Sequence, residues 1–377
     1  MSLINYLTRI HFADEVMEEA LVAELAVNAV KRPLVVTDEG IVAAGLCDRL
    51  LAGIGQHAEP VVWSGTPSNP TEAATLEAVE VYRAEGCDGL IGFGGGSPID
   101  LAKAVALLAT HDGPLMNYAA VEGGIGRIRN VLPPVIAIPT TAGTGAEVGR
   151  AAVIVLGDGR KLGIISPFLI PKVAICDPTL TLALPPRLTA ATGMDALTHC
   201  VETYIATAWN PPADGIAIDG LKRAAANIVR AVENGLDLDA RREMMAAALN
   251  GALAFQKGLG GVHAMSHALG GLPGYRLHHG MLNAILLPGM LRFNAPAVVH
   301  RYGALKDAMR LPPEADLAQA IASLNRRIGL PETLSEIGVD TQAIELAAPL
   351  AEKDHTNGTN PRRAVAADYR ALMLAAL

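Results

Sequence analysis

The chain has 377 residues, of which 51% are hydrophobic and 18% are charged, and its formal net charge is −8. This length exceeds one ordinary hydrophobic core and predicts two domains, and the composition is that of a well-packed globular protein. Nucleic acids and anionic membrane surfaces are bound by clustered Lys and Arg. Because the sequence has no long basic run, we expect neither a nucleic acid nor a membrane as a partner.

The cysteines and the N-terminal segment bear on the cellular compartment. The four cysteines, at positions 47, 87, 176 and 200, form no CxxC pair, which favours reduced thiols. Charged residues such as Arg9, Asp14 and Glu15 interrupt any apolar signal core near the N-terminus. Apolar runs such as 131–138 are short and contain proline, so they fall below the length of a membrane span. We therefore expect a soluble cytoplasmic protein.

The first half of the chain alternates short β-branched runs with Ala/Leu-rich stretches. Strands are predicted at 33–38, 59–63, 89–93 and 135–139. Between them, helices are predicted up to Leu50, at 69–84 with Thr71 as a cap, and at 101–109. Strands that alternate with helices in this way are typical of βαβ units and predict a mostly parallel sheet.

The character of the sequence changes after Leu184. Two prolines interrupt the chain there, and the Ala/Leu-rich stretches beyond them contain few β-branched runs. Helices are predicted at 187–206, 212–234, 239–255 and 263–269, with a loop at 348–363 before a last short helix. We therefore predict an α/β domain over residues 1–184 and an all-helical domain over residues 185–377.

A glycine-rich loop, GFGGGSPIDLAK at 92–103, joins the third predicted strand to the following helix. Glycines let the backbone approach a phosphate closely, and the N–H groups at a helix N-terminus attract anions. Ser97 or Asp100 is expected to cap this helix, with Pro98 in its first turn. The same glycines would also suit a tight bend without a ligand.

Two other features of the first half suit a dinucleotide. The segment PTTAGTGAE at 139–147 again follows a strand, and its threonine hydroxyls could bind a pyrophosphate or form an ordinary capped turn. Asp38 closes the first predicted strand, where a carboxylate can accept the ribose hydroxyls and would repel a 2′-phosphate. This favours NAD over NADP, although a strand-end Asp is also common in turns.

Five of the ten histidines fall in three short, otherwise apolar segments of the predicted helical domain. Asp195 and His199 are four residues apart on one helix face, and His263 and His267 repeat that spacing. The third segment holds adjacent histidines at 278 and 279. One carboxylate and several imidazoles suit Fe²⁺ or Zn²⁺ rather than Ca²⁺. A single such histidine is commonly a core residue, but three segments together favour a metal centre.

Taken together, these segments resemble the iron-containing (group III) alcohol dehydrogenase family. The motifs that carry the resemblance are GGGSPIDLAK at 94–103, PTTAGTGAE at 139–147, TAATGMDALTH at 189–199, and HAMSH at 263–267 followed by His279-Gly280. The resemblance implies a Rossmann-like α/β N-terminal domain with a parallel sheet and an all-helical C-terminal domain, the dehydroquinate synthase-like architecture. It also implies a cleft for cofactor and metal between the domains, and a homodimer.

The family pattern assigns roles to individual positions. The implied metal ligands are Asp195, His199, His263 and His279, for Fe²⁺ or alternatively Zn²⁺. His267 would be the catalytic residue near the nicotinamide, where it would help to move a proton. The implied NAD-binding residues are Asp38, Asn69, Gly95, Gly96, Ser97, Asp100, Thr140, Thr141, Thr144, Lys161 and Leu180.

The sequence departs from the family pattern in two places. Ala146 stands where the family usually has serine, which removes one hydroxyl near the cofactor. The stretch from His267 to His279 is longer than usual and leaves His278 as an alternative last ligand. His279 is favoured because a glycine follows the ligand in the family motif.

The implied reaction is hydride transfer between NAD and a small alcohol or aldehyde, with a metal that polarises the substrate oxygen. Two alternatives are a maleylacetate reductase, in which Asn tends to replace Asp195, and a dehydroquinate synthase-like lyase, which needs a basic cluster for a phosphorylated substrate. Asp195 is retained, and the ligand segments show no such cluster. Lys257 and Arg276 flank these segments, where either could pair with a substrate carboxylate, so an acid semialdehyde substrate is a further hypothesis. The alternative is that both are ordinary surface charges at a helix end.

Overall fold

The structure, a computed structural model, describes residues 8–377. Residues 1–7 lie outside the described part. They belong to the N-terminal segment in which the sequence predicts no apolar signal core. The described chain divides into two compact units, one of residues 8–141 and 145–183 and the other of residues 142–144 and 184–377. We predict that the first unit binds the cofactor and that the second binds the metal, and this assignment stays a prediction.

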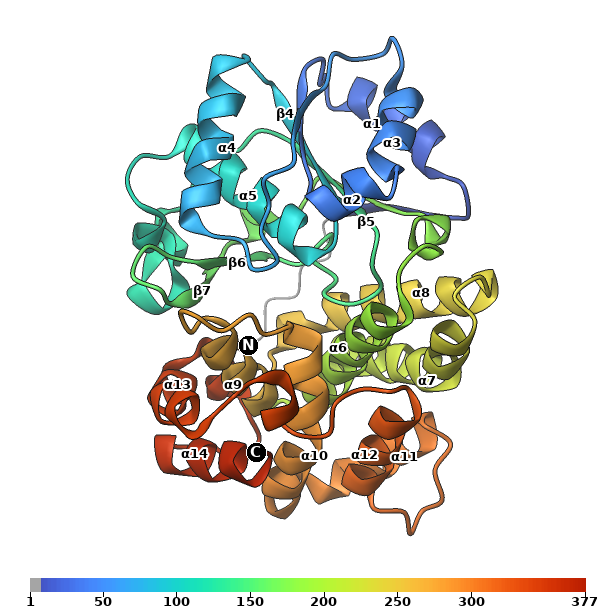
Figure 1. The fold of residues 1–377 in the computed structure, drawn as a ribbon, viewed down its shortest axis with the longest axis vertical. Helices are drawn as coiled ribbons and strands as arrows, with labels where there is room; N and C mark the ends of the chain where they lie inside the picture. Colours follow the sequence, from blue (N-terminus) through green and yellow to red (C-terminus); the bar gives the residue numbers. More distant parts are fainter. Residues whose placement is uncertain (1–7) are drawn as a thin grey trace. The chain divides into compact units, whose positions relative to one another are not determined.

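A six-stranded, fully parallel sheet forms the centre of the first unit, as the alternating pattern predicts (Figure 1). Its strand order is β1-β8-β5-β4-β2-β3. The strands are β1 (Arg9–Phe12), β2 (Pro33–Val36), β3 (Val61–Trp63), β4 (Gly89–Gly94), β5 (Val135–Pro139) and β8 (Val173–Cys176). A separate antiparallel hairpin, which the sequence analysis did not predict, consists of β6 (Ala151–Val155) and β7 (Lys161–Ile165).

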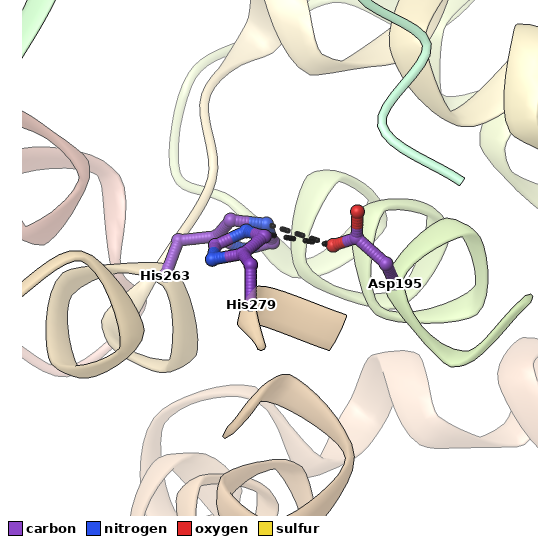
Figure 2. A group of neighbouring side chains, drawn as sticks. All are labelled: Asp195, His263 and His279. Atoms are coloured by element: carbon purple, nitrogen blue, oxygen red, sulfur yellow. Dashed lines mark ion pairs between the residues drawn. The ribbon is translucent and has the colours of Figure 1, made fainter. Parts of the chain in front are cut away.

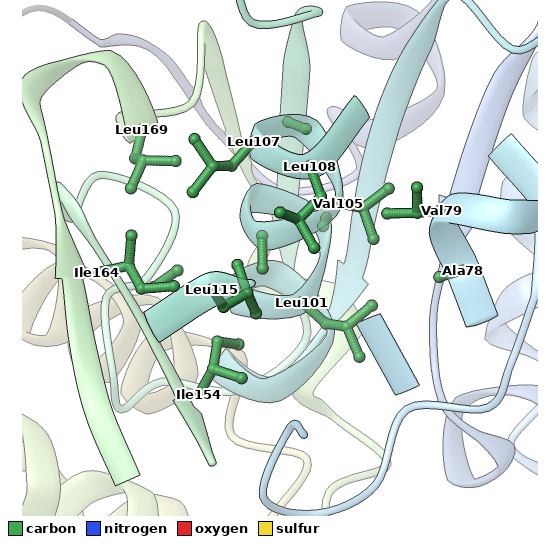
Figure 3. Packing of buried hydrophobic residues seen from close by; sticks show 14 of the residues in the cluster. Ala78, Val79, Leu101, Val105, Leu107, Leu108, Leu115, Ile154, Ile164 and Leu169 are labelled. Carbon is green, nitrogen blue, oxygen red and sulfur yellow. The ribbon is translucent and has the colours of Figure 1, made fainter. Parts of the chain in front are cut away.

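Helices cover both faces of this sheet. They are α1 (Met17–Val27), α2 (Glu39–Ala43), α3 (Leu46–Ile54), α4 (Glu72–Ala84) and α5 (Gly96–Thr110). Strand β2 shows how the two faces separate: Leu34 and Val36 join the buried cluster of α4, α5 and the hairpin (Figure 3), while Val35 joins that of α1 and α3. Successive side chains of a strand point to opposite faces, so each face has its own apolar core.

The ends of these helices differ from the predicted ones in ways that single residues explain. Thr71 caps α4 as predicted, because its side chain accepts a hydrogen bond from the Ala74 N–H. The stretch after β2 is two helices rather than one, since Gly45 has a φ of 73°. The predicted caps of α5 are wrong: the helix begins at Gly96, and its N-cap, Gly95, makes no side-chain bond.

The second unit is helical, as predicted. Its helices are α6 (Pro186–Ile205), α7 (Pro211–Glu233), α8 (Leu238–Ala254), α9 (Gly261–Gly270), α10 (His279–Val298), α11 (Tyr302–Ala308), α12 (Leu317–Arg327), α13 (Thr341–Lys353) and α14 (Ala366–Ala375). Helices α6, α7 and α8 pack against one another, α10 packs against α6 and α9, and α13 packs against α9. The predicted loop at 348–363 is wrong in its first part, because α13 continues to Lys353.

One apolar stretch, residues 279–308, is long enough to cross a membrane by length and composition alone. It comprises α10 and the short helices that follow it. Of its most apolar window, 56% is buried inside the protein, as in the core helix of a soluble protein. This stretch therefore carries no argument for a membrane partner.

Candidate metal centre and nucleotide site

Helix α6 presents three polar side chains on one face. Asp195, His199 and Glu202 follow one another at intervals of four and three residues, and all three are buried. The neighbouring helix α8 approaches this face closely, because a Cβ at Gly251 would lie only 3.0 Å from the Cβ of His199. Small residues on α8 therefore let a buried carboxylate and imidazole lie in the interior of the helical unit.

Three imidazoles surround one oxygen of Asp195. The Nε2 atoms of His199, His263 and His279 lie 3.8, 3.7 and 3.6 Å from its Oδ1, respectively (Figure 2 shows the last two). These separations exceed the usual hydrogen-bond length. They approach the ~3.4 Å between two ligand atoms on a tetrahedral metal with bonds of about 2.1 Å. The potential ligand atoms of Asp195, His263 and His279 all lie within 4.8 Å of one another, while His199 meets the group at Asp195. These carboxylate and imidazole donors fit a transition-metal ion.

The adjacent histidines at the start of α10 have different surroundings. His279 is the first residue of the helix, and it belongs to the group of potential ligands with Asp195 and His263. Among the described residues, His278 is not in that group; it precedes α10 as the N-cap residue. The geometry therefore favours His279 as the last ligand, as the following glycine suggested, although ligation itself stays a prediction.

The electrostatics of this group follow from burial and mutual contact. Burial alone would raise the pKa of Asp195, but the surrounding imidazoles outweigh it and hold that pKa well below its ordinary value. Burial lowers the pKa of His199 to about 4, against the attraction of Asp195. Burial also opposes protonation of His263, yet the neighbouring carboxylates of Asp195 and Glu202 raise its pKa to about 9. The surroundings thus stabilise positive charge on His263 and disfavour it on His199.

Two residues that the sequence analysis missed contact the predicted ligands. Glu202 accepts a hydrogen bond from Nδ1 of His263 at 2.6 Å. Asn283, one turn after His279 on α10, donates from Nδ2 to Asp195 Oδ1 at 2.7 Å and lies 3.2 Å from His279 Nε2. Their spacing was visible in the sequence, since Glu202 and Asn283 share helix faces with Asp195 and His279.

His267 lies beside the potential ligands and has a carboxylate partner of its own. Its Nδ1 is 3.0 Å from Asp354 Oδ2, and its ring stacks on that of His279 with centroids 5.4 Å apart. Thr356 donates to the other oxygen of Asp354 from both its N–H and its hydroxyl. Burial would raise the pKa of Asp354, but His267 and these hydrogen bonds keep it well below its ordinary value. The ionised carboxylate can hold the Nδ1 proton of His267, so that Nε2 can exchange a proton.

Several predicted cofactor residues meet at the carboxyl edge of the parallel sheet, where β4 pairs with both β2 and β5. Asp38 caps α2 through Oδ1, and its Oδ2 is 3.4 Å from the position that a Cβ of Gly94 would take. A Cβ at Gly95 would lie 3.6 Å from the Thr141 hydroxyl, and Thr140 donates its N–H to the Gly94 carbonyl. The glycines thus bring the backbone close to polar groups at the ends of three adjacent strands, although Pro98 Cγ, 2.8 Å from a Cβ of Gly94, occupies the space beside that residue.

Two further contacts join other predicted cofactor residues to this edge. Ser97 donates its hydroxyl to the Ser68 carbonyl at 2.7 Å. Lys161, at the start of β7, donates to Asn69 Oδ1 at 2.8 Å. The segment around Asn69 therefore contacts both the start of α5 and the hairpin.

Three predicted cofactor residues have other surroundings. Asp100 is occupied within the α/β unit, where its Oδ2 accepts from the Val153 N–H at 3.1 Å and its Oδ1 lies 3.3 Å from Lys103 Nζ. Leu180 is part of the apolar core beneath α1 and α3. Thr144 groups with the helical unit. Roles for these residues in NAD binding stay predictions.

The two basic residues considered for a substrate carboxylate also differ. Lys257 is buried, donates to the Tyr204 carbonyl at 2.8 Å and pairs with Asp214, which also pairs with Arg301. This is a structural ion pair at a helix end. Arg276, by contrast, is exposed in the segment between α9 and α10.

Comparisons with known proteins show the family of the chain. The family model described as iron-containing alcohol dehydrogenase matches residues 8–178, and that of the Fe-containing alcohol dehydrogenase family, C-terminal, matches residues 189–377. A 4-hydroxybutyrate dehydrogenase of Cupriavidus necator is 52% identical over 99% of both chains.

Solved structures give the same result. A crystal structure of 1,3-propanediol oxidoreductase has a TM-score of 0.93 and 35% identity, with all of both chains covered. A sulfoacetaldehyde reductase of Bifidobacterium kashiwanohense, in complex with NAD⁺, has a TM-score of 0.87 and 26% identity over 100% of this chain and 99% of that chain. The matches confirm the resemblance seen in the sequence. The chain therefore belongs to the iron-containing alcohol dehydrogenase family and is an oxidoreductase of alcohols and aldehydes.

Proposed function

We propose that the protein is an NAD-linked dehydrogenase whose activity depends on a bound Fe²⁺, or alternatively Zn²⁺. The observation that carries this proposal is the arrangement of three imidazole Nε2 atoms within 3.8 Å of one oxygen of Asp195. We infer that Asp195, His199, His263 and His279 hold the metal. When bound, such an ion acts as a Lewis acid that polarises the oxygen of the substrate.

The protein's own groups have separate tasks in this proposal. NAD would lie at the carboxyl edge of the parallel sheet, with its phosphates at the glycines that open α5 and its adenosine ribose at Asp38. NAD carries the hydride, and the chain orients it. His267, with its Nδ1 held by Asp354, would accept the proton that an alcohol loses on oxidation and return it on reduction.

The first test is the dependence of turnover on metal. Chelator-stripped protein is assayed for NADH consumption against small aldehydes, with and without Fe²⁺ or Zn²⁺ restored under anaerobic conditions. We expect turnover only with metal. Equal turnover without metal would instead indicate a maleylacetate reductase-type enzyme and would contradict the assigned ligand roles. Failure on every aldehyde would favour the lyase alternative.

We further propose that the substrates include an ω-hydroxy acid and its semialdehyde. The support is the name of the 52% identical relative, a 4-hydroxybutyrate dehydrogenase, together with the exposed Arg276 two residues before the histidine pair. An arginine can bind a carboxylate through two parallel hydrogen bonds. Lys257 takes no part in this proposal, because its ammonium group is buried against Asp214.

The substrate proposal is tested by comparing 4-hydroxybutyrate with 1-butanol, which has the same chain length without the carboxylate. Arg276→Ala should raise KM about 10- to 100-fold for the acid, because a hydrogen bond to a charged group contributes ~1.5–3 kcal/mol. It should leave KM for the uncharged alcohol unchanged. The matched control is Arg292→Ala, an exposed arginine 13 residues further along α10 and therefore roughly 20 Å from His279. An equal effect on both substrates would contradict a role in carboxylate binding.

We also propose that the enzyme works in the cytoplasm as a homodimer. All four cysteines are buried and unpaired with one another, which suits a reducing compartment. The dimer follows only from family membership. Light scattering on the purified protein tests it, and a monomer at working concentration would contradict it.

A further inference from the structure

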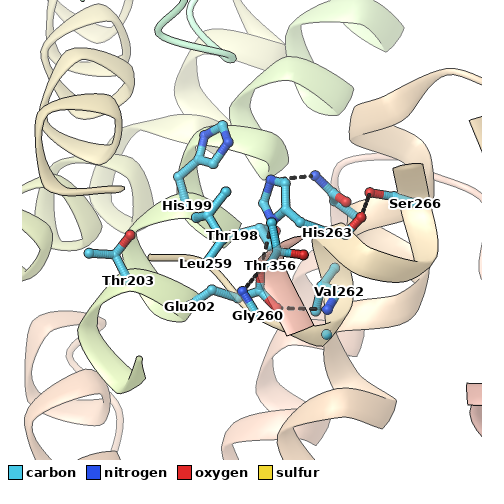
Figure 4. Close-up of polar contacts among 12 residues, drawn as sticks. Thr198, His199, Glu202, Thr203, Leu259, Gly260, Val262, His263, Ser266 and Thr356 are labelled. Atoms are coloured by element: carbon cyan, nitrogen blue, oxygen red, sulfur yellow. Dashed lines mark hydrogen bonds and ion pairs between the residues drawn. The ribbon is translucent and has the colours of Figure 1, made fainter. Parts of the chain in front are cut away.

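The buried carboxylate of Glu202 has no assigned task in the reaction, yet it connects two helices that carry predicted metal ligands. It lies on α6, three residues after His199, with a side chain only 2% exposed. Its Oε1 accepts the Val262 N–H at 2.7 Å, and its Oε2 accepts both the Gly260 N–H at 3.1 Å and Nδ1 of His263 at 2.6 Å (Figure 4).

These contacts place a negative charge at the N-terminus of α9, where N–H groups lack partners within the helix and the helix dipole is positive. The approach is close, since a Cβ at Gly260 would lie 2.8 Å from Glu202 Oε1. Backbone donors already occupy both oxygens, so the carboxylate cannot turn away from His263 without leaving buried N–H groups unpaired. The position of the side chain is therefore fixed by α9 itself.

An imidazole can bind a metal through Nε2 only when that nitrogen carries no proton. A carboxylate that accepts from Nδ1 keeps the proton there and turns Nε2 the other way, which here is toward Asp195 at 3.7 Å. Glu202 thus acts on the ring nitrogen opposite the predicted metal position, and it does so from the same helix that supplies Asp195 and His199.

We propose that Glu202 is a positioning residue of the metal centre, which holds His263 as the Nδ1–H tautomer and fixes α9 against α6. This inference rests on the proposed metal-dependent function. It assigns Glu202 no contact with substrate or cofactor.

Glu202→Gln discriminates between this role and mere helix capping. A glutamine has the same shape but only one acceptor oxygen, whereas the two carboxylate oxygens accept from donors on both sides. If the amide oxygen stays at Val262, the NH₂ group faces His263 and favours the Nε2–H tautomer, which cannot bind a metal. If the amide is reversed, the NH₂ group opposes the Val262 N–H. In either arrangement the glutamine holds His263 and the N-terminus of α9 less firmly than the carboxylate does.

The measurement is Zn²⁺ affinity, determined by competition with a chromophoric chelator on otherwise intact protein. We expect Glu202→Gln to bind Zn²⁺ about 10- to 100-fold more weakly, as is usual when the partner of a metal-bound histidine is lost. The matched control is Asn360→Ala. Asn360 Oδ1 accepts the Gly261 N–H at 3.1 Å at the same helix end. That control should lower the melting temperature and leave Zn²⁺ affinity within about threefold.

Equal Zn²⁺ affinity of Glu202→Gln and wild type would overturn the inference. An equal loss in Glu202→Gln and Asn360→Ala would overturn it as well, because helix capping would then explain both. If the wild type itself binds no Zn²⁺ or Fe²⁺ and turns over without metal, the proposed function fails first.

If Glu202→Gln does not fold, the Nδ1 proton of His263 is observed in the Zn²⁺-loaded wild type by nuclear magnetic resonance. A short hydrogen bond to a buried carboxylate predicts a slowly exchanging proton, shifted downfield. A rapidly exchanging proton at an ordinary shift would overturn the proposal.

Discussion

Gly280 is a position where one added methyl group should disturb the candidate metal centre without replacing any of its proposed ligands. It follows His279 at the start of α10 and packs against α6. A Cβ at this position would lie 2.1 Å from the carbonyl oxygen of Ala191 and 2.7 Å from its carbonyl carbon. Both obstructing atoms belong to the backbone of α6, one turn before Asp195, so they cannot rotate away. Gly280→Ala must therefore push the two helices apart.

The size of the effect follows from these distances. A carbon and a carbonyl oxygen are normally at least ~3.3 Å apart, so the substitution requires a movement of about 1 Å. Metal ligands tolerate only about 0.2 Å. The 3.6 Å separation of His279 Nε2 and Asp195 Oδ1 would therefore leave the range that suits a metal. We expect a loss of about 100-fold or more in metal-dependent turnover and ~1–3 kcal/mol in stability.

Gly289→Ala provides the matched control on the same helix. A Cβ there would have Leu372 Cδ2, at 3.8 Å, as its nearest neighbour, which is ordinary van der Waals contact. This variant should keep wild-type Zn²⁺ affinity and gain up to about 1 kcal/mol of stability from helix propensity. Zn²⁺ competition and thermal melting compare the two variants. If Gly280→Ala matched Gly289→Ala in both measurements, the contact between α6 and α10 would not set the ligand geometry.

Three further predictions concern the cofactor, pH and the metal. Asp38→Gly should shift the coenzyme preference from NADH toward NADPH, and an unchanged kcat/KM ratio for the two coenzymes would refute the role of Asp38. Burial raises the pKa of Glu147 to about 7 from 4.5, so its protonated form stabilises the fold at low pH, and this stabilisation is lost as pH rises through about 7. We expect the melting temperature of the wild type to fall between pH 4.5 and 7 because of Glu147, and that of Glu147→Gln to lack this fall. An equal fall in both proteins would contradict the role of Glu147. Zn²⁺ at 100 times its Kd should stabilise the stripped wild type by about 2.7 kcal/mol in denaturant titrations, and the same stabilisation of Asp195→Asn would argue against Asp195 as a ligand.

The sequence predicted those parts of the fold that depend on local pattern. The alternation of strands and helices gave the parallel sheet, and the apolar periodicity gave α6 to α9. It failed where tertiary packing overrides a local rule. Pro349 lies inside α13, although proline usually ends a helix. The predicted start of α5 lies too far along the chain, because its first turn, Gly-Ser-Pro, lacks the helical spacing of apolar residues by which helices were predicted.

The candidate site was predictable to the extent that its residues share helix faces. The spacing of Asp195 and His199 and that of His263 and His267 placed them together from the sequence alone. Asp354, by contrast, is 87 residues from His267, and only the fold brings the two side chains together. The same spacing argument applies to Glu202. A glutamate in a helix is ordinarily exposed, however, so its position in the sequence did not mark it as a buried residue of the site.

Helix α9 carries two histidines for which we propose different tasks, and a carboxylate from a different element lies at Nδ1 of each. Glu202 of α6 holds His263, whereas Asp354, directly after α13, holds His267. This separation predicts opposite defects in the two amide variants. Asp354→Asn should slow turnover about 100-fold or more, because an amide stabilises the protonated imidazole of His267 less than a carboxylate does. It should keep Zn²⁺ affinity within about threefold of wild type.

Glu202→Gln should do the reverse and weaken Zn²⁺ binding first, with turnover largely recovered at saturating metal. The comparison requires both variants to be folded, which thermal melting establishes. If Asp354→Asn lost Zn²⁺ affinity as strongly as Glu202→Gln, the two carboxylates would act together by fixing the rotation of α9. The stacked rings of His267 and His279, 5.4 Å apart, would then be the route by which a change at Asp354 reaches the ligands. Independent defects would show that one helix holds a metal ligand and a proton-transfer residue under separate control.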